Sequence, residues 1–81
     1  MKTTKENVIA YVEANSYLQL DDEEEISFTT RRHGNVGDGI YSEDDYYAAI
    51  EIGKKVKKEF ENVDYNIDTC DEWVNLYITI N

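Results

Sequence analysis

The longest amphipathic pattern in the chain runs from Tyr41 to Asn62. Apolar residues recur there at steps of three and four, the spacing that gives a helix one apolar stripe: Tyr46, Ala49, Ile50, Gly53, Val56 and Phe60. Ser42, followed three residues later by Asp45, is a typical N-terminal capping sequence. The pattern predicts one long helix against which the rest of the chain packs. Glycine costs a helix interior about 1 kcal/mol relative to alanine, so we expect close backbone approach at Gly53.

A second, shorter helix is expected from about Thr4 to Asn15. Thr3 and Glu6 have the spacing of a capping box. The apolar residues that follow form one broad face: Val8, Ile9, Tyr11 and Val12.

Three segments alternate apolar and polar residues as half-buried strands do: Ile26–Arg32, Val63–Thr69 and Trp73–Ile80. An even-length turn centred on Asp71 and Glu72, of either two or four residues, pairs the last two strands so that all their apolar residues share one face. The expected partners are Thr69 with Val74, Ile67 with Leu76, Tyr65 with Ile78, and Val63 with Ile80. A slip of one residue would turn one apolar set outward.

The element order α-β-α-β-β in 81 residues predicts a single α+β domain spanning residues 1–81. We expect a two-layer sandwich in which a three-stranded antiparallel sheet carries both helices on one face. The last strand is the most apolar, which favours a central position and a sheet order of 1-3-2.

This arrangement leaves one sheet face without helices. Its expected residues are Ser27, Thr29, Arg31, Asp64, Asn66, Asp68, Trp73, Asn75 and Tyr77. Trp73 and Tyr77 are the residue types that most often anchor protein contacts, so we expect this face to bind a partner or a second copy of the chain. The alternative is that Trp73 only covers an edge of the core. Asp64 and Asp68 fit either a weak cation site or a solvated face.

Charge changes this picture. The net charge is −10, and residues 21–45 alone hold nine acids and two arginines, for a net −7. Such a chain repels nucleic acid and anionic membranes, so we expect direct binding to neither. The five consecutive acids of Asp21–Glu25 indicate an exposed loop or strand entry. Three interpretations stay open for that run: a solvated loop, an acidic docking surface, or a calcium site, which usually needs converging acids and a turn glycine.

Candidate catalytic residues are few. His33 and Cys70 are the single histidine and the single cysteine, and the expected topology puts a strand between them, too far apart for a nucleophile–base pair. The glycine-rich loop His33–Ile40 lacks a phosphate-binding motif, and four zinc ligands are not available. We therefore expect no enzyme activity, cofactor or metal. A lone cysteine and the lack of a signal sequence favour the cytoplasm.

In size, acidity, tyrosine content and lack of catalytic motifs, the chain resembles small phage or mobile-element anti-defence proteins, including anti-CRISPR and DNA-mimic inhibitors. The resemblance implies that exposed acids replace nucleic-acid phosphates on a basic partner such as a nuclease, in the host cytoplasm if the protein is phage-encoded. The expected partner-binding residues, with the two aromatics of the open face, are Asp21, Asp22, Glu23, Glu24, Glu25, Asp38, Glu43, Asp44, Asp45, Trp73 and Tyr77. The alternative is a homodimeric structural or regulatory module that associates through the open sheet face.

Overall fold

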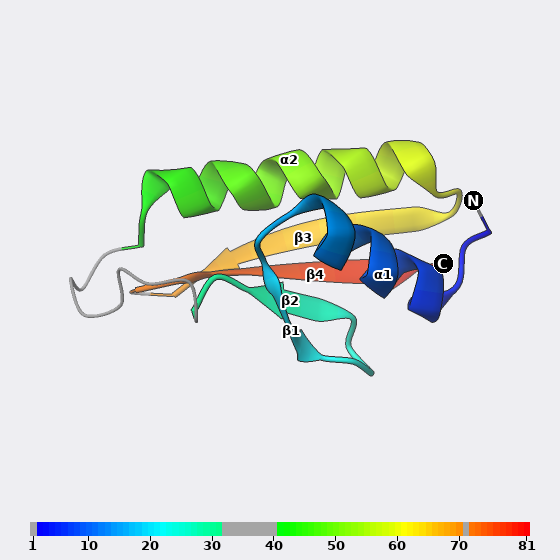
Figure 1. The fold of residues 1–81 in the computed structure, drawn as a ribbon, viewed down its shortest axis with the longest axis horizontal. Coiled ribbons are helices and arrows are strands. Elements are labelled where there is room, and N and C mark those ends of the chain that lie inside the picture. Colours follow the sequence, from blue (N-terminus) through cyan, green and yellow to red (C-terminus); the bar gives the residue numbers. More distant parts are fainter. Residues whose placement is uncertain (1, 32–40, 71) are drawn as a thin grey trace.

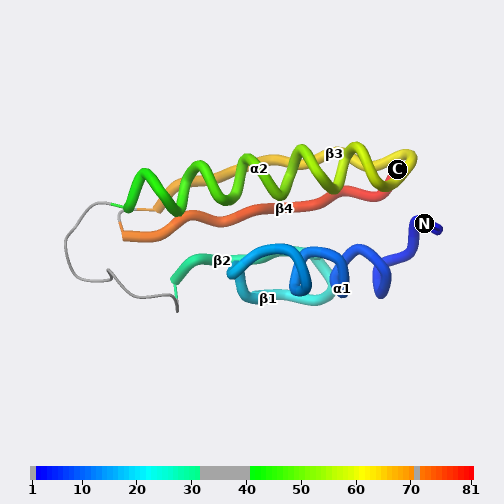
Figure 2. Tube along the Cα trace, turned by 45° about the horizontal axis from the view of Figure 1, so that its top comes forward, coloured from blue at the N-terminus to red at the C-terminus, as the bar shows by residue number. Residues whose placement is uncertain are grey.

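A computed structural model describes residues 2–31, 41–70 and 72–81. Two helices and four strands follow one another along the chain (Figure 1). Their bounds are α1 Lys5–Asn15, β1 Gln19–Asp22, β2 Ser27–Thr29, α2 Glu43–Glu59, β3 Val63–Thr69 and β4 Val74–Ile80. All neighbouring strands are antiparallel, in the order β1-β2-β4-β3, and both helices lie on one face of this sheet (Figures 1 and 2). The α+β class is as predicted.

The prediction of three strands was wrong, because β1 adds a fourth at the edge of the sheet. The three expected strands keep the relative order β2-β4-β3. In β1, Leu20 pairs with Phe28 and Asp22 with Ser27, and the register shifts between them, so Asp21 forms a bulge. The run of acids concealed this strand, since like charges at neighbouring positions indicated a loop.

The acidic hairpin tip is built by its first acid. Asp22 Oδ1 accepts hydrogen bonds from the backbone N–H groups of Glu24 and Glu25, at 2.9 and 3.2 Å. Ile26 then has a φ of +54°, a left-handed conformation that is rare for a β-branched residue. Ile26 is nevertheless buried, and its carbonyl accepts the N–H of Ile78 at 3.0 Å. The turn therefore exposes the acids and returns the chain to the sheet.

The β3–β4 hairpin has the predicted register. Every expected pair is present: Thr69 with Val74, Ile67 with Leu76, Tyr65 with Ile78, and Val63 with Ile80. A backbone bond of 2.8 Å from Cys70 N to Trp73 O closes the hairpin. Burial of Val74, Leu76 and Ile78 fixes this register, because a slip would expose all three.

The long helix is shorter than predicted, and its buried stripe is rotated. Ile52 is buried whereas Ile50 is only half-buried, so the expected stripe was wrong at that position. Ser42 is the N-cap as predicted and accepts the N–H of Asp44 at 3.2 Å. A φ of +60° at Asn62 turns the chain from the helix into β3.

The shorter helix begins one residue later than its capping sequence suggested. Its N-cap is Thr4, which accepts the N–H of Asn7 at 3.1 Å. Thr3 instead donates its hydroxyl to the carbonyl of Glu61 at 2.9 Å, tying the start of the chain to the end of α2.

Gly53 makes the close approach that the sequence predicted. A Cβ atom placed on it would lie 2.6 Å from Cδ2 of Tyr65. The ring of Tyr65 therefore occupies the space that any larger residue would need, and α2 packs directly onto β3.

Candidate protein-binding surface

The face of the sheet opposite the helices, here called the open face, is set by alternation along β2 and β4. Phe28 and Leu76 are paired and fully buried on the helix side. Their neighbours Ser27 and Tyr77 are also paired, and must point the other way. Ser27 is 1% exposed even there, and its hydroxyl has no hydrogen-bond partner among the described residues. Longer side chains on the adjacent strands therefore cover the short side chains of β2.

Acids from three parts of the fold act electrostatically on Tyr77. Partial burial, together with the negative charges of Asp68, Glu25 and Asp21, raises the pKa of the Tyr77 hydroxyl above its usual range, and Cys70 adds to this. Asp68 comes from β3, Asp21 from β1 and Glu25 from the hairpin tip. The fold therefore collects negative charge around the aromatic residue that the sequence singled out.

Trp73 is half-buried immediately before β4, and a basic residue covers its ring. The guanidinium carbon of Arg31 lies 4.8 Å from the ring centroid. This is a cation–π contact. Arg32 lies outside the described residues.

The predicted acidic residues divide into groups. All five of Asp21–Glu25 are exposed on the hairpin, and Glu43 and Asp44 are exposed at the start of α2. Asp38 lies outside the described residues. Asp45 is 3% exposed, so its assignment to a partner-contacting surface is corrected.

The buried carboxylate of Asp45 accepts a hydrogen bond from another side chain. The hydroxyl of Tyr17 donates to Asp45 Oδ1 at 2.7 Å. Burial, followed by this bond and the nearby negative charges, raises the pKa of Tyr17. Asp45 therefore ties the connection after α1 to the first turn of α2, at the position where the positive end of the helix dipole favours a carboxylate.

The two exposed acidic groups do not form one patch. The hairpin tip leads into Ile26, which bonds to Ile78. Gly53 of α2 lies at this same level, since it contacts Tyr65, the partner of Ile78. Glu43 precedes Gly53 by ten residues, which is about 15 Å along a helix. Figure 1 shows the start of α2 and the β1–β2 tip well apart.

Sequence reasoning gave too little weight to the acids of β3. Asp64, Asn66 and Asp68 are exposed and point to the open face, because their neighbours Val63 and Tyr65 face the helices. Asp64 accepts a hydrogen bond from Lys57 Nζ at 2.7 Å and another from the side-chain amide of Asn81 at 3.2 Å. Charge-assisted bonding to Lys57 lowers the pKa of Asp64. The alternation of β3 was the signal that placed these residues beside Trp73 and Tyr77.

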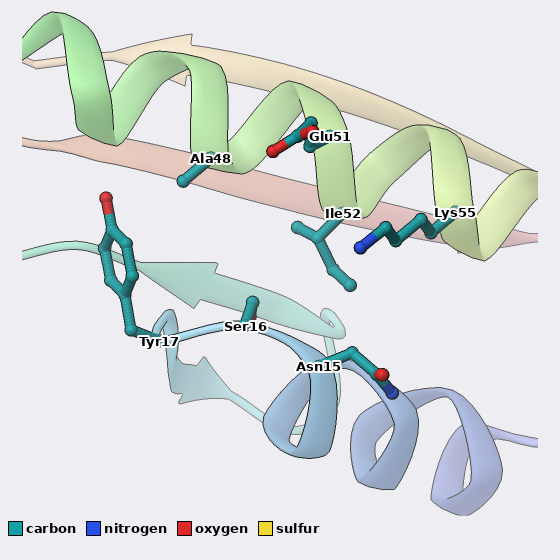
Figure 3. Close-up of a pocket in the computed structure, with 7 residues that line it drawn as sticks. All are labelled: Asn15, Ser16, Tyr17, Ala48, Glu51, Ile52 and Lys55. Atoms are coloured by element: carbon teal, nitrogen blue, oxygen red, sulfur yellow. The ribbon is translucent and has the colours of Figure 1, made fainter.

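A cleft of about 170 Å³ separates the end of α1 from α2 (Figure 3). Its walls come from Asn15, Ser16, Tyr17, Ala48, Glu51, Ile52 and Lys55. Several of the polar groups in the wall are already bonded within the chain: Asn15 and Ser16 donate to helix carbonyls at 2.8 Å, and Tyr17 donates to Asp45. Of these bonds, the one from Tyr17 to Asp45 joins the connection after α1 to α2.

Of the two candidate catalytic residues, the structure describes Cys70. Cys70 is half-buried, and the amide nitrogen of Asn75 lies 3.5 Å from its sulfur. His33 lies outside the described part of the chain. Within that part, no group of three or more histidine, cysteine or acidic residues converges as metal ligands would. Neither of the described helices combines the length and apolar character needed to cross a membrane.

Comparison with protein-family models, with curated proteins and with solved structures finds no match to this chain.

Proposed function

We propose that this protein is a non-enzymatic acidic binding protein that docks on a basic, nucleic-acid-handling protein of the cytoplasm and inhibits it by presenting carboxylates in place of phosphates. The observation that carries the proposal is the place of Tyr77 on a face without helices, paired with Asn66 between Asp64 and Asp68 and acted on by the charges of Asp21 and Glu25. An aromatic residue with acids on the same face suits a partner that offers lysine and arginine side chains.

The hairpin tip supplies the phosphate-like part of this surface. Its acids are exposed, and none of them forms an ion pair with another residue that the structure describes. Uncompensated charge of this kind accelerates association with an oppositely charged protein, and the acceleration is lost as salt screens the charge.

A tagged pull-down from a lysate of the source organism tests the proposal, with washes at about 0.05 M and about 0.5 M salt, where screening differs strongly. Wild type is compared with a variant in which residues 21–25 are replaced by their amides. We expect wild type to retain a DNA- or RNA-handling protein at low salt only, and the amide variant to lose it. Capture that is indifferent to both changes would refute the proposal.

The alternative, a homodimeric module that uses the open face, draws on the partial exposure of Trp73 and Tyr77. It requires a dimer in solution and a monomer after Trp73→Ala, which sedimentation measures. The acids whose charge acts on Tyr77 favour a basic partner over a second acidic copy.

A further inference from the structure

The outer edge of β3 has backbone groups that the sheet does not use. In an antiparallel ladder, bonded pairs alternate with non-bonded ones. The bonds from Cys70 N to Trp73 O and from Asn81 N to Asn62 O, both 2.8 Å, make the even-numbered residues of β3 the ones that bond to β4. The odd-numbered residues therefore point their N–H and C=O groups away from β4: Val63, Tyr65, Ile67 and Thr69.

The opposite strand confirms this alternation. By the same rule Ile78 and Val74 must point their backbone groups toward β2. Ile78 N donates to Ile26 O at 3.0 Å, and Val74 O accepts from Thr30 N at 3.0 Å. β3 is the last strand in the sheet order, so among the described strands none pairs with its outer side.

Lys57 covers one end of the outer edge of β3. Asp64 points to the open face, while α2, which carries Lys57, lies on the opposite face. The 2.7 Å contact between them therefore passes around the edge of the sheet. Such a lysine is a common guard against unwanted strand pairing. The edge beyond it, from Tyr65 to Thr69, has no corresponding ion pair in the part of the chain described.

Lys57 also identifies the side of α2 that overhangs the edge. Ile50 precedes Lys57 by seven residues and Tyr46 precedes Ile50 by four, spacings that put all three on one side of a helix. Ile50 and Tyr46 are half-buried there, as are Tyr65 and Ile67 on β3. One side of the edge is therefore bordered by a partly exposed apolar ledge.

The other side of the same edge is acidic and polar. Asp64, Asn66 and Asp68 alternate along it and are exposed. A strand added to β3 would thus place alternate side chains against an apolar ledge and against carboxylates.

From this arrangement we infer that the outer edge of β3 binds an extended segment of a basic protein, in which lysine or arginine alternates with apolar residues, by adding it to the sheet as a fifth strand. The inference rests on the proposed function and names the binding mode of the partner. Main-chain hydrogen bonds provide affinity in such complexes, and the alternating side chains provide specificity.

A second copy of the chain fits this edge poorly. Symmetric pairing of two β3 strands about Asn66 places Asp64 of each copy opposite Asp68 of the other, and like charges opposite each other destabilise a sheet. Two chains of net charge −10 also repel one another.

The test uses an eight-residue peptide of alternating lysine and valine as the probe, with binding followed by amide NMR shifts of the labelled full chain. Two N-methylated forms, one methylated on every valine and one on every lysine, each remove one alternate set of donors. We expect the parent peptide to bind at β3 and one methylated form to lose about tenfold or more in affinity while the other binds normally, since each lost main-chain bond costs about 1 kcal/mol.

The methylated peptide that loses affinity also shows whether the added strand runs antiparallel or parallel to β3. Antiparallel pairing turns the donors of the residues on the apolar side toward β3, so methylated valines block it. Parallel pairing instead turns the N–H groups of the lysines toward β3, so methylated lysines block it. Equal affinity for the two methylated forms, or no binding of the parent peptide, would overturn the inference.

A matched pair of variants separates the site from bulk charge. Asp68→Asn and Glu13→Gln each remove one exposed carboxylate, the first beside the edge and the second on α1. We expect Asp68→Asn to weaken peptide binding about threefold and Glu13→Gln to leave it nearly unchanged, given the modest value of an exposed ion pair. Equal effects would show that charge alone binds the peptide, which contradicts strand addition but leaves the proposed function intact. The proposed function is refuted by a separate result, a pull-down in which wild type captures no nucleic-acid-handling protein in a salt-sensitive way.

Discussion

Gly53 lets α2 approach the ring of Tyr65 on β3 closely. Replacement by alanine would gain about 1 kcal/mol of helix propensity. The added Cβ would, however, lie 2.6 Å from the ring of Tyr65, and overpacking of this kind costs about 1–3 kcal/mol. We predict that Gly53→Ala lowers the free energy of unfolding by about 1 kcal/mol, as measured by urea denaturation.

The same substitution in a Tyr65→Ala background is the control. With the ring removed, only the propensity gain remains, and Gly53→Ala should become stabilising by up to about 1 kcal/mol. An equal effect in both backgrounds would mean that the ring is not what excludes a side chain at position 53.

The hydrogen bond between Tyr17 and Asp45 gives a second prediction about single residues. Tyr17→Phe removes a donor from a carboxylate that is 3% exposed, and we expect it to cost about 1–2 kcal/mol at neutral pH. Because folding raises the pKa of Tyr17 above its ordinary value of about 10, the folded state holds this proton more tightly than the unfolded chain does.

The sign of the pH dependence follows from that difference. The contribution of Tyr17 is fully present below about pH 10 and is lost as the pH rises further, since the unfolded chain then releases the proton first. Urea denaturation at neutral and alkaline pH should show that the difference in free energy of unfolding between wild type and Tyr17→Phe becomes smaller above pH 10. A difference of constant size would contradict the assigned role of the hydroxyl.

At the scale of elements, the hairpin between β1 and β2 depends on Asp22 as an acceptor rather than as a charge. Its Oδ1 accepts two backbone N–H groups. We predict that Asp22→Ala lowers the free energy of unfolding by about 1 kcal/mol, whereas Asp22→Asn, which keeps an acceptor oxygen, changes it by less than half as much. Similar losses for both variants would show that charge, not turn geometry, is what matters.

The β3–β4 hairpin was predictable because its apolar residues permit only one register. The first strand was not, since Leu20 is the only apolar residue between Gln19 and Asp22, and it becomes a strand by pairing with Phe28. Propensity and charge pattern give no sign of such a pairing, which depends on the rest of the sheet.

The candidate site was predictable in part for related reasons. Alternation placed Trp73, Tyr77 and Asp68 on one face before the structure did. No sequence pattern distinguished Asp45 from Asp44, because the burial of Asp45 depends on Tyr17, 28 residues earlier in the chain. The partial exposure of Ile50 likewise follows from how α2 is rotated on the sheet, which helical periodicity alone leaves open by about one residue.

For the whole molecule, a net charge of −10 and acids on the open face oppose self-association. We predict a monomer in sedimentation equilibrium at high micromolar concentration and low salt, where repulsion is least screened. A dimer that Trp73→Ala dissociates would instead support the homodimeric module.

The proposed function requires this chain to occupy a basic surface that otherwise holds nucleic acid. The most direct measurement is fluorescence anisotropy of a labelled nucleic acid bound to the protein captured in the pull-down, with this chain added as competitor at two salt concentrations. We expect wild type to displace the nucleic acid, more weakly at high salt, and the amide variant of residues 21–25 to displace it poorly. Nucleic acid that stays bound while this chain also binds would contradict the account.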